Sequence, residues 1–433
     1  MAATKSGRLP GRHRRPAERQ ATYGEVIALG EFRALWLGQG LSLLGDQLSR
    51  VALSVLVFER TDSPLATASV YALTYLPPII GGPLLAGLAD RYARRRIMIA
   101  CDLLRALLVA LMAIPGTSFP VLCALVFCVV LLSAPFSAAR AALLPELLEG
   151  DRYVAGSALQ NMTNQGAQML GFAAGGALIM AMGPYRALAL DAVTFLLSAL
   201  IIVFGVRRRP APAQADGGRP SMWMMTRAGA RLVFGDRRLR TLVLIAWLCG
   251  FYVLPEGIAT PYAAALTGGD DAQRISLVTG LLMGAMPTGT VVGAFLFSRY
   301  VSPSGRLRMM GWMAMLTCAP LVLCALRPPL TVVLVLWFLS GVGGAYQLAA
   351  NAAFVQCVPA EQRGQAFGLV QSGLLASQGL GILVGGAAAD HLGPELVVAL
   401  AGAAGLTVAA ALAALWRRCR REVIERVRAE APL

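Results

Sequence analysis

The sequence has little charge and almost no histidine. Charged residues make up 14% of the 433-residue chain, and its two histidines are His13 and His391. Intramembrane proteases and transferases typically need histidine, paired aspartates or a Ser/His set at membrane depth, and the chain has no H-E-x-x-H or other metal-ligand pattern. It also lacks the glycine-rich phosphate loop of ATP-driven pumps. The sequence therefore predicts no enzyme activity, no metal and no cofactor.

Apolar residues are abundant. They make up 57% of the chain, which a water-covered domain could hardly sustain. Stretches of about 20 apolar residues recur, each long enough to cross the hydrocarbon core as a helix. We expect an all-α integral membrane protein with twelve spans, over residues 32–58, 65–89, 97–115, 119–143, 154–182, 187–206, 239–266, 275–298, 307–326, 330–355, 365–389 and 396–416.

The basic residues follow the expected loops in alternation. The formal charge is +15, which in a soluble protein would suggest a nucleic-acid partner. Here most Lys and Arg fall in the tails and in loops on one side, whereas the other side has only Arg60, Arg186, Arg274 and Arg327. This positive-inside pattern places both termini in the cytoplasm and predicts no nucleic-acid partner.

The chain repeats itself at an offset of about 210 residues. At this offset Pro77 matches Pro287, and the Gly183-Pro184 corner matches Gly393-Pro394. Two six-helix units in tandem have the same orientation, so we expect two parallel-repeat halves. The expected divisions are a basic cytoplasmic tail (1–31), the first half (32–206), a cytoplasmic linker (207–238), the second half (239–416) and a second basic tail (417–433).

Two acids occupy equivalent places in the first helix of each half, because adding 210 to the number of Asp46 gives Glu256. A charge near the bilayer centre costs about 2.5 to 3.5 kcal/mol and suggests a function. Arg50 follows Asp46 at i+4, so the two can pair on one helix face. Glu256 has no basic neighbour in its helix and is the preferred proton carrier. Proton coupling, binding of a cationic substrate and structural pairing all remain open for these residues.

Amide side chains recur on two further predicted helices. Spacings of three, four and seven residues put several amides of residues 154–182 on one face. Gln371 and Gln378 are the equivalents of Asn161 and Gln168, and Gln165 belongs to the same face. These residues are expected either to line a cavity or to form interhelical hydrogen bonds.

The segment 88–96, Leu-Ala-Asp-Arg-Tyr-Ala-Arg-Arg-Arg, resembles the signature loop of the major facilitator superfamily. The family pattern reads roughly G-x-L-A-D-R-x-G-R-R, and its charged residues lock the cytoplasmic ends of the two halves together when the transporter faces outward. The resemblance assigns this latch to Asp90, Arg91, Arg94 and Arg95, while a role in topology alone remains the alternative. Asp102 and Arg105, one turn apart, are expected to extend the same network.

A second motif carries the resemblance further. Gly171, Gly175 and Gly176 match part of the antiporter signature G-x-x-x-G-P-x-x-G-G, with Phe172 in place of the proline. We expect these glycines to allow close helix packing without the kink that a proline would cause. With residues 32–46, 102–105 and 140–148, they make the chain similar to the branch of enterobactin and macrolide exporters.

The resemblance implies a fold and a function. In this family the first helix of each half lines the central cavity, so Asp46 and Glu256 are expected to face a common pathway. The chain would then export a small lipophilic compound, such as a drug, an antibiotic or a siderophore, in exchange for protons across the bacterial cytoplasmic membrane. Its partners would be the substrate, protons and the lipid bilayer. Import or uniport of a small solute, and a receptor without transport activity, are the alternatives.

Overall fold

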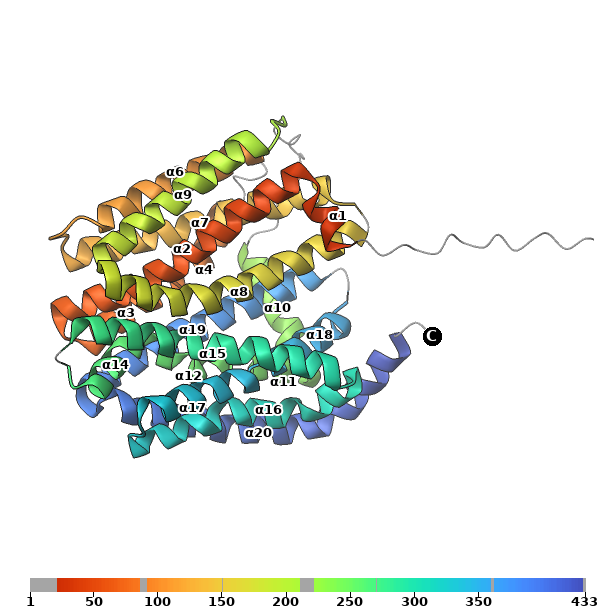
Figure 1. Cartoon of the computed structure of the whole chain (residues 1–433). Helices are drawn as coiled ribbons and strands as arrows, with labels where there is room; N and C mark the ends of the chain where they lie inside the picture. Colours follow the sequence, from red (N-terminus) through yellow and green to blue (C-terminus); the bar gives the residue numbers. More distant parts are fainter. Residues whose placement is uncertain are drawn as a thin grey trace, which may run out of the picture.

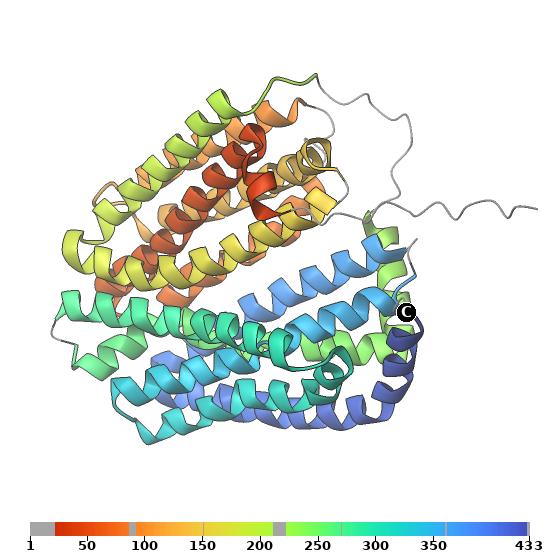
Figure 2. The ribbon, with the colours of Figure 1, turned by 45° about the vertical axis from the view of Figure 1, so that its right-hand side comes forward.

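The computed structural model of the chain describes residues 22–85, 92–149, 151–210, 222–269, 271–359 and 362–430. Within these ranges every regular element is a helix. Figure 1 shows two stacked bundles, one from the first half of the chain (red to yellow-green) and one from the second (green to blue), and Figure 2 shows the same division from a second direction. The prediction of an all-α protein in two halves is confirmed.

The first bundle opens with the short helix α1 (Tyr23–Ile27), which the Thr22 hydroxyl caps by accepting a hydrogen bond from the Glu25 N–H. Proline at the first position starts two of the longer helices, where its missing N–H leaves no hydrogen bond unmade. The longer helices are α2 (Gly30–Thr61), α3 (Pro64–Ala72), α4 (Leu76–Leu85), α6 (Arg94–Met112), α7 (Phe119–Leu147), α8 (Asp151–Met182) and α9 (Pro184–Gly205).

The second bundle follows α10 (Met222–Gly235), which lies within the expected linker. Two of its membrane segments are interrupted. The first is α11 (Arg237–Trp247), α12 (Cys249–Tyr252), α13 (Leu254–Gly257) and α14 (Ala259–Thr267); the second is α17 (Leu330–Gly343) and α18 (Tyr346–Cys357). The others are α15 (Ala272–Tyr300), α16 (Pro303–Val322) with the 3₁₀ turn η1 (Leu323–Leu326), α19 (Arg363–Leu392) and α20 (Pro394–Glu430).

Nine helical segments in the described ranges are long and apolar enough to cross a membrane. Three further expected spans correspond to α3 with α4, to α6 and to α8. The first is broken at residues 73–75, α6 contains five charged residues, and α8 is rich in amides, so none of the three meets the same measure. All three pack among the other helices of their bundle, and a count of twelve remains a prediction.

The internal repeat is visible in the backbone. Gly183 and Gly393 each precede a proline that starts a helix, with φ angles of 80° and 82° and ψ angles of 163° and 150°. A residue with a side chain rarely adopts this positive φ, so glycine is needed at both corners. The same sharp turn therefore stands at equivalent places of the two halves, between α8 and α9 and between α19 and α20.

The two halves touch near one end of the helices, which we call the Gly183 end; the opposite end is called the Arg95 end. Gly176 on α8 faces Gly280 on α15, and Gly386 on α19 faces Ala68 on α3. Close to this end Ser54 and Thr260 share a hydrogen bond of 2.7 Å, and Asp390 accepts one of 3.1 Å from the Leu65 N–H. The described inter-half hydrogen bonds all lie between the middle of the helices and the Gly183 end.

The outer faces of the bundles are apolar. Leu103, Leu104, Leu107 and Leu111 of α6 are each more than a third exposed, as are several leucines of α9. Soluble monomers rarely expose apolar faces of this extent, whereas a lipid-facing helix must. These faces are the parts of the chain that contact the bilayer.

Candidate functional site

Glu256 lies on the interrupted segment of the second half. Pro255 and Pro261 lack the N–H that would continue the helical hydrogen-bond ladder, so the segment breaks into short turns around the acid. The side chain is 9% exposed and accepts a hydrogen bond of 2.9 Å from the Tyr71 hydroxyl, which comes from α3 of the first half. A buried acid of one half is thus bonded across the interface to the other.

Arg50 brings a positive charge to the same region. It is half-buried on α2 and lies within electrostatic reach of Tyr71, Tyr75, Asp46 and Glu256. It forms no ion pair with another described residue. We call Arg50, Tyr71, Tyr75 and Glu256 the central cluster; it joins α2, the α3–α4 region and α13 where the two halves meet.

Asp46 is held by a residue that the sequence did not pair with it. The Arg105 Nη2 donates to both carboxylate oxygens of Asp46, at 2.9 and 3.2 Å, and Arg105 Nη1 lies 4.0 Å from Asp102 Oδ1. The Asp46–Arg50 pair that the i+4 spacing allowed is not formed, because Asp46 on α2 faces Arg105 on α6 in its own half. Arg105 is buried, and its guanidinium lies 4.0 Å from the centre of the Phe195 ring, a cation–π contact.

Two further carboxylates complete this group, which we call the acidic cluster: Asp46, Asp102, Arg105 and Asp191. Asp191 on α9 accepts hydrogen bonds from the Ser49 hydroxyl and, at 3.0 Å, from the Thr194 hydroxyl. Asp102 accepts one of 2.6 Å from Ser198. Both aspartates are fully buried.

Gly45 on α2 makes this approach possible, because a Cβ there would stand 2.1 Å from Asp191 Oδ1. The cluster therefore holds two carboxyl groups beside a single buried guanidinium, with the buried carboxyl of Asp191 nearby. The sequence singled out Asp46 but missed Ser49, Ser198 and Gly45, since hydroxyls and glycines inside apolar helices usually serve packing.

The predicted latch residues are only partly described. Asp90 and Arg91 lie outside the described residues. Arg94 forms an ion pair with Glu146 and donates to the Ala142 carbonyl at 3.1 Å, and Arg95 donates to the Val203 carbonyl at 2.6 Å. These partners all belong to the first half.

Asp102 and Arg105 lie 4.0 Å apart, as their spacing allowed, and their other described contacts lie in the acidic cluster and not with Arg94 or Arg95. A different charge network occupies the Arg95 end. Glu31 accepts from Arg209 at 2.7 Å and lies 3.3 Å from Arg207. Sequence reasoning missed this network because its members come from α2 and from the residues after α9.

The predicted amides lie on α8 and α19. Asn161 and Gln371 are exposed, whereas Gln165, Gln168 and Gln378 are half-buried. None of the five is hydrogen-bonded to the other half among the described residues. Neighbouring groups bond α8 to α2 instead, since Trp36 donates to the Thr163 hydroxyl at 2.7 Å.

The three motif glycines of α8 face two different neighbours. Gly171 and Gly175 lie against α2, where their missing Cβ atoms would meet Gln47 and Val51. Gly176 lies against the backbone of Gly280 in α15. Helix α8 runs unbroken through Phe172, in keeping with the absence of a proline from the motif.

Comparisons with known proteins agree on the kind of molecule. The chain is 27% identical over 373 residues to the multidrug efflux pump Tap of Mycolicibacterium fortuitum, covering 81% of this chain and 87% of that one. A shorter stretch of 74 residues is 32% identical to macrolide efflux protein A of Streptococcus pyogenes, covering 17% and 18%.

Solved structures of other transporters share the fold. The nucleoside transporter NupG superposes with a TM-score of 0.66 at 14% identity, over 89% of this chain and 99% of that one. A POT family transporter in complex with 5-aminolevulinic acid gives 0.67 at 12% identity, over 90% and 96%. Residues 35–266 and 258–432 both match the sequence profile of the Major Facilitator Superfamily. The chain belongs to this superfamily and is a multi-pass membrane transporter with relatives among drug efflux pumps.

Proposed function

We propose that the protein is a proton-coupled exporter of a small lipophilic compound that works by alternating access. The observation that carries this proposal is the hydrogen bond between Glu256 and Tyr71, because it places an ionisable group on the interface that must open and close. Transporter folds commonly build their coupling sites from discontinuous helices near the bilayer midplane, and Glu256 lies at such a break.

The protonation state of Glu256 would bias the two conformations. As a carboxylate it accepts the Tyr71 hydrogen bond and attracts the nearby Arg50, both of which belong to the other half. Protonation removes that attraction and weakens the acceptor, so the Gly183 end becomes easier to open. A ligand or proton shifts such an equilibrium only by its differential affinity for the two states. Glu256 would provide this difference, because it would bind a proton more tightly in the open state than in the closed one.

The acidic cluster would supply a second coupling group. Three carboxyls near one guanidinium would leave excess negative charge in the membrane if all were ionised, and a proton on one of them would reduce that excess. Asp46 is the most accessible of the three, with a side chain 28% exposed. A cationic substrate that approaches Asp46 would compete with Arg105 for the same oxygens, which links proton handling to substrate binding.

The distribution of arginines assigns a direction to the structure. Positive-inside orientation puts the Arg95 end, with both termini, in the cytoplasm. The halves are in contact toward the Gly183 end, so the structure would represent a state closed to the outside. Export fits the efflux-pump relatives, whereas import or uniport with the same fold is the second candidate.

Transport into inverted membrane vesicles tests the proposal. Lipophilic cations and macrolides would be offered with and without an imposed proton gradient, to the intact protein and to Asp46→Asn, Glu256→Gln and the double variant. Glu59→Gln is the matched control, because Glu59 is an exposed acid on the same helix as Asp46. We expect gradient-driven uptake to fall at least about tenfold in the double variant, which corresponds to about 1.4 kcal/mol, and to persist in the control.

Each outcome has a meaning. Full gradient-driven uptake by the double variant would refute coupling through these acids. Uptake that is unaffected by the gradient in the intact protein would favour a uniporter. Right-side-out vesicles that accumulate the compound would reverse the proposed direction.

A further inference from the structure

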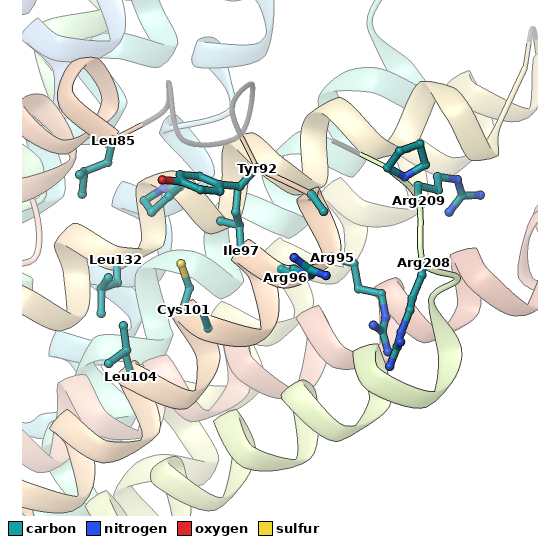
Figure 3. A pocket seen from close by; sticks show the side chains of 14 residues that line it. Leu85, Tyr92, Arg95, Arg96, Ile97, Cys101, Leu104, Leu132, Arg208 and Arg209 are labelled. Atoms are coloured by element: carbon teal, nitrogen blue, oxygen red, sulfur yellow. The ribbon is translucent and has the colours of Figure 1, made fainter. Parts of the chain in front are cut away.

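A groove of about 560 Å³ opens at the Arg95 end, on the outer side of the first bundle. The start of α6, the middle of α7, the end of α4 and the residues that follow α9 line it. Figure 3 shows its polarity: the labelled apolar side chains Leu85, Cys101, Leu104 and Leu132 gather at one end, and the arginines stand at the other. The groove is therefore amphipathic along its length.

The polar end carries positive charge that is only partly compensated. Arg95, Arg96, Arg208 and Arg209 line it, and no Asp or Glu does so among the described residues. Glu31 engages Arg209, whose side chain extends away from the others in Figure 3. Arg95 donates one hydrogen bond to the Val203 carbonyl, and its buried Nε has no hydrogen-bond partner. A buried charged donor without an acceptor is costly unless an acceptor arrives.

The helix itself adds to this positive potential. Helix α6 begins with three arginines at 94–96, has no side-chain cap and has no acid in its first turn. The free N–H groups of a helix N-terminus carry about half a positive charge, which repels cations and attracts anions. Arg94 is neutralised by Glu146, but Arg95 and Arg96 have no carboxylate partner among the described residues. The local charges favour a phosphate.

The apolar end leads to the bilayer. Leu104 is 48% exposed and continues the row formed by Leu103, Leu107 and Leu111 on the lipid-facing side of α6. A soluble anion would leave this part of the groove empty, whereas an acyl chain would fill it. Basic pockets between transmembrane helices on the cytoplasmic side are suited to anionic lipid headgroups.

We propose that this groove binds an anionic phospholipid of the cytoplasmic leaflet, with its phosphate at Arg95, Arg96 and Arg208 and an acyl chain along Ile97, Cys101, Leu104 and Leu132. The proposal rests on the assignment of the Arg95 end to the cytoplasm but not on transport or proton coupling. A lipid in this place bonds the start of α6 to the residues after α9. It thereby fastens the beginning of the segment between the halves to the first bundle.

Native mass spectrometry of the purified full-length protein tests the proposal. The protein would be exposed in detergent to phosphatidylglycerol or phosphatidylcholine, and the number of retained lipids counted as detergent is removed. We expect one phosphatidylglycerol to be retained more firmly than the others. The double variant Arg96→Gln/Arg208→Gln should weaken that retention by about fivefold or more, the effect expected from losing charge contacts near a membrane surface.

Two further variants distinguish lipid binding in the groove from a general effect of positive charge. Arg299→Gln/Arg308→Gln removes the same charge at the Arg95 end of the second bundle, from exposed positions, and should retain the lipid as the intact protein does. Leu104→Trp leaves the charge unchanged but fills the apolar end, and should also reduce retention.

Three results would overturn the proposal. The first is equal retention by the Arg96/Arg208 variant and by its control. The second is equal retention of phosphatidylcholine and phosphatidylglycerol by the intact protein. The third is displacement of the lipid by soluble glycerophosphate at comparable concentration, which would indicate a simple phosphate site. Because these measurements involve no transport, their failure is distinguishable from failure of the proposed export.

Discussion

The contact between Gly176 and Gly280 yields a quantitative prediction about the conformational equilibrium. A Cβ at Gly176 would lie 2.8 Å from the Gly280 Cα and from the Ser276 carbonyl oxygen, both backbone atoms of α15. Ordinary contacts begin at about 3.4 Å, so α8 and α15 must separate by roughly 0.6 Å. Backbone atoms cannot rotate away, as the end of a flexible side chain could.

Overpacking of this kind costs about 1 to 3 kcal/mol. The cost falls only on the state in which the two halves touch at this point. Gly176→Ala should therefore shift the equilibrium toward opening of the Gly183 end by roughly 5- to 150-fold. Gly280→Ala should act at least as strongly, since its Cβ would meet the Gly176 Cα at 2.5 Å.

Double electron–electron resonance between spin labels at Ser118 and Leu326 reports this opening. Both residues are exposed at the Gly183 end, one in each half, and the native cysteines would first be replaced. Gly175→Ala is the matched control, because its Cβ would make an ordinary 3.4 Å contact with Val51 inside the first half. Identical distance distributions for Gly176→Ala and the unmodified protein would refute the reasoning, as would an equal shift in the control.

Other predictions concern the two clusters and the contact of Asp390 with the start of α3. Tyr71→Phe removes the hydrogen bond to Glu256, which contributes about 1.5 to 3 kcal/mol when the acceptor is charged. The same distance distribution should shift toward opening, and an unchanged distribution would mean that the bond does not form in the membrane. Arg105→Gln leaves the buried carboxylates without their cation, a change that costs about 3 to 5 kcal/mol, and should lower the thermal midpoint in detergent by several degrees, whereas an unchanged midpoint would contradict the buried ion pair. Asp390→Ala removes the exposed carboxylate of α19 that accepts a hydrogen bond from the Leu65 N–H at the start of α3. Its effect on opening should be small, about two- to fivefold, and an effect as large as that of Gly176→Ala would contradict the reasoning.

Hydropathy and the repeat predicted the fold well, because a membrane helix must be apolar along its length and a duplicated half must turn at the same places. The Gly183 and Gly393 corners confirm this at the level of single backbone angles. The three less apolar segments were predicted from the same recurring apolar stretches, although they fall short of the measure that the other nine meet. In α6 the charged residues Asp102 and Arg105 are buried among other helices, so mean hydropathy underestimates how well this helix fits the membrane.

The partners of the ionisable residues were harder to predict. The i+4 spacing of Asp46 and Arg50 says that they can meet, but not whether a third helix offers a better partner. Arg105 reaches Asp46 only because α6 and α2 are rotated toward each other, and Gly45 lets α9 approach the same point. Helix rotation depends on the packing of many small residues, which no local pattern in one sequence specifies.

The two close crossings between the halves lie on different helix pairs, α8 with α15 and α3 with α19. Rigid bodies that kept only these two contacts could rotate only about the line that joins them. A rotation about this line would change the distance between the two halves at the Arg95 end while both glycine crossings remain in place. The glycines at these crossings would then do more than allow close packing, because they would lie on the axis of such a rocking motion.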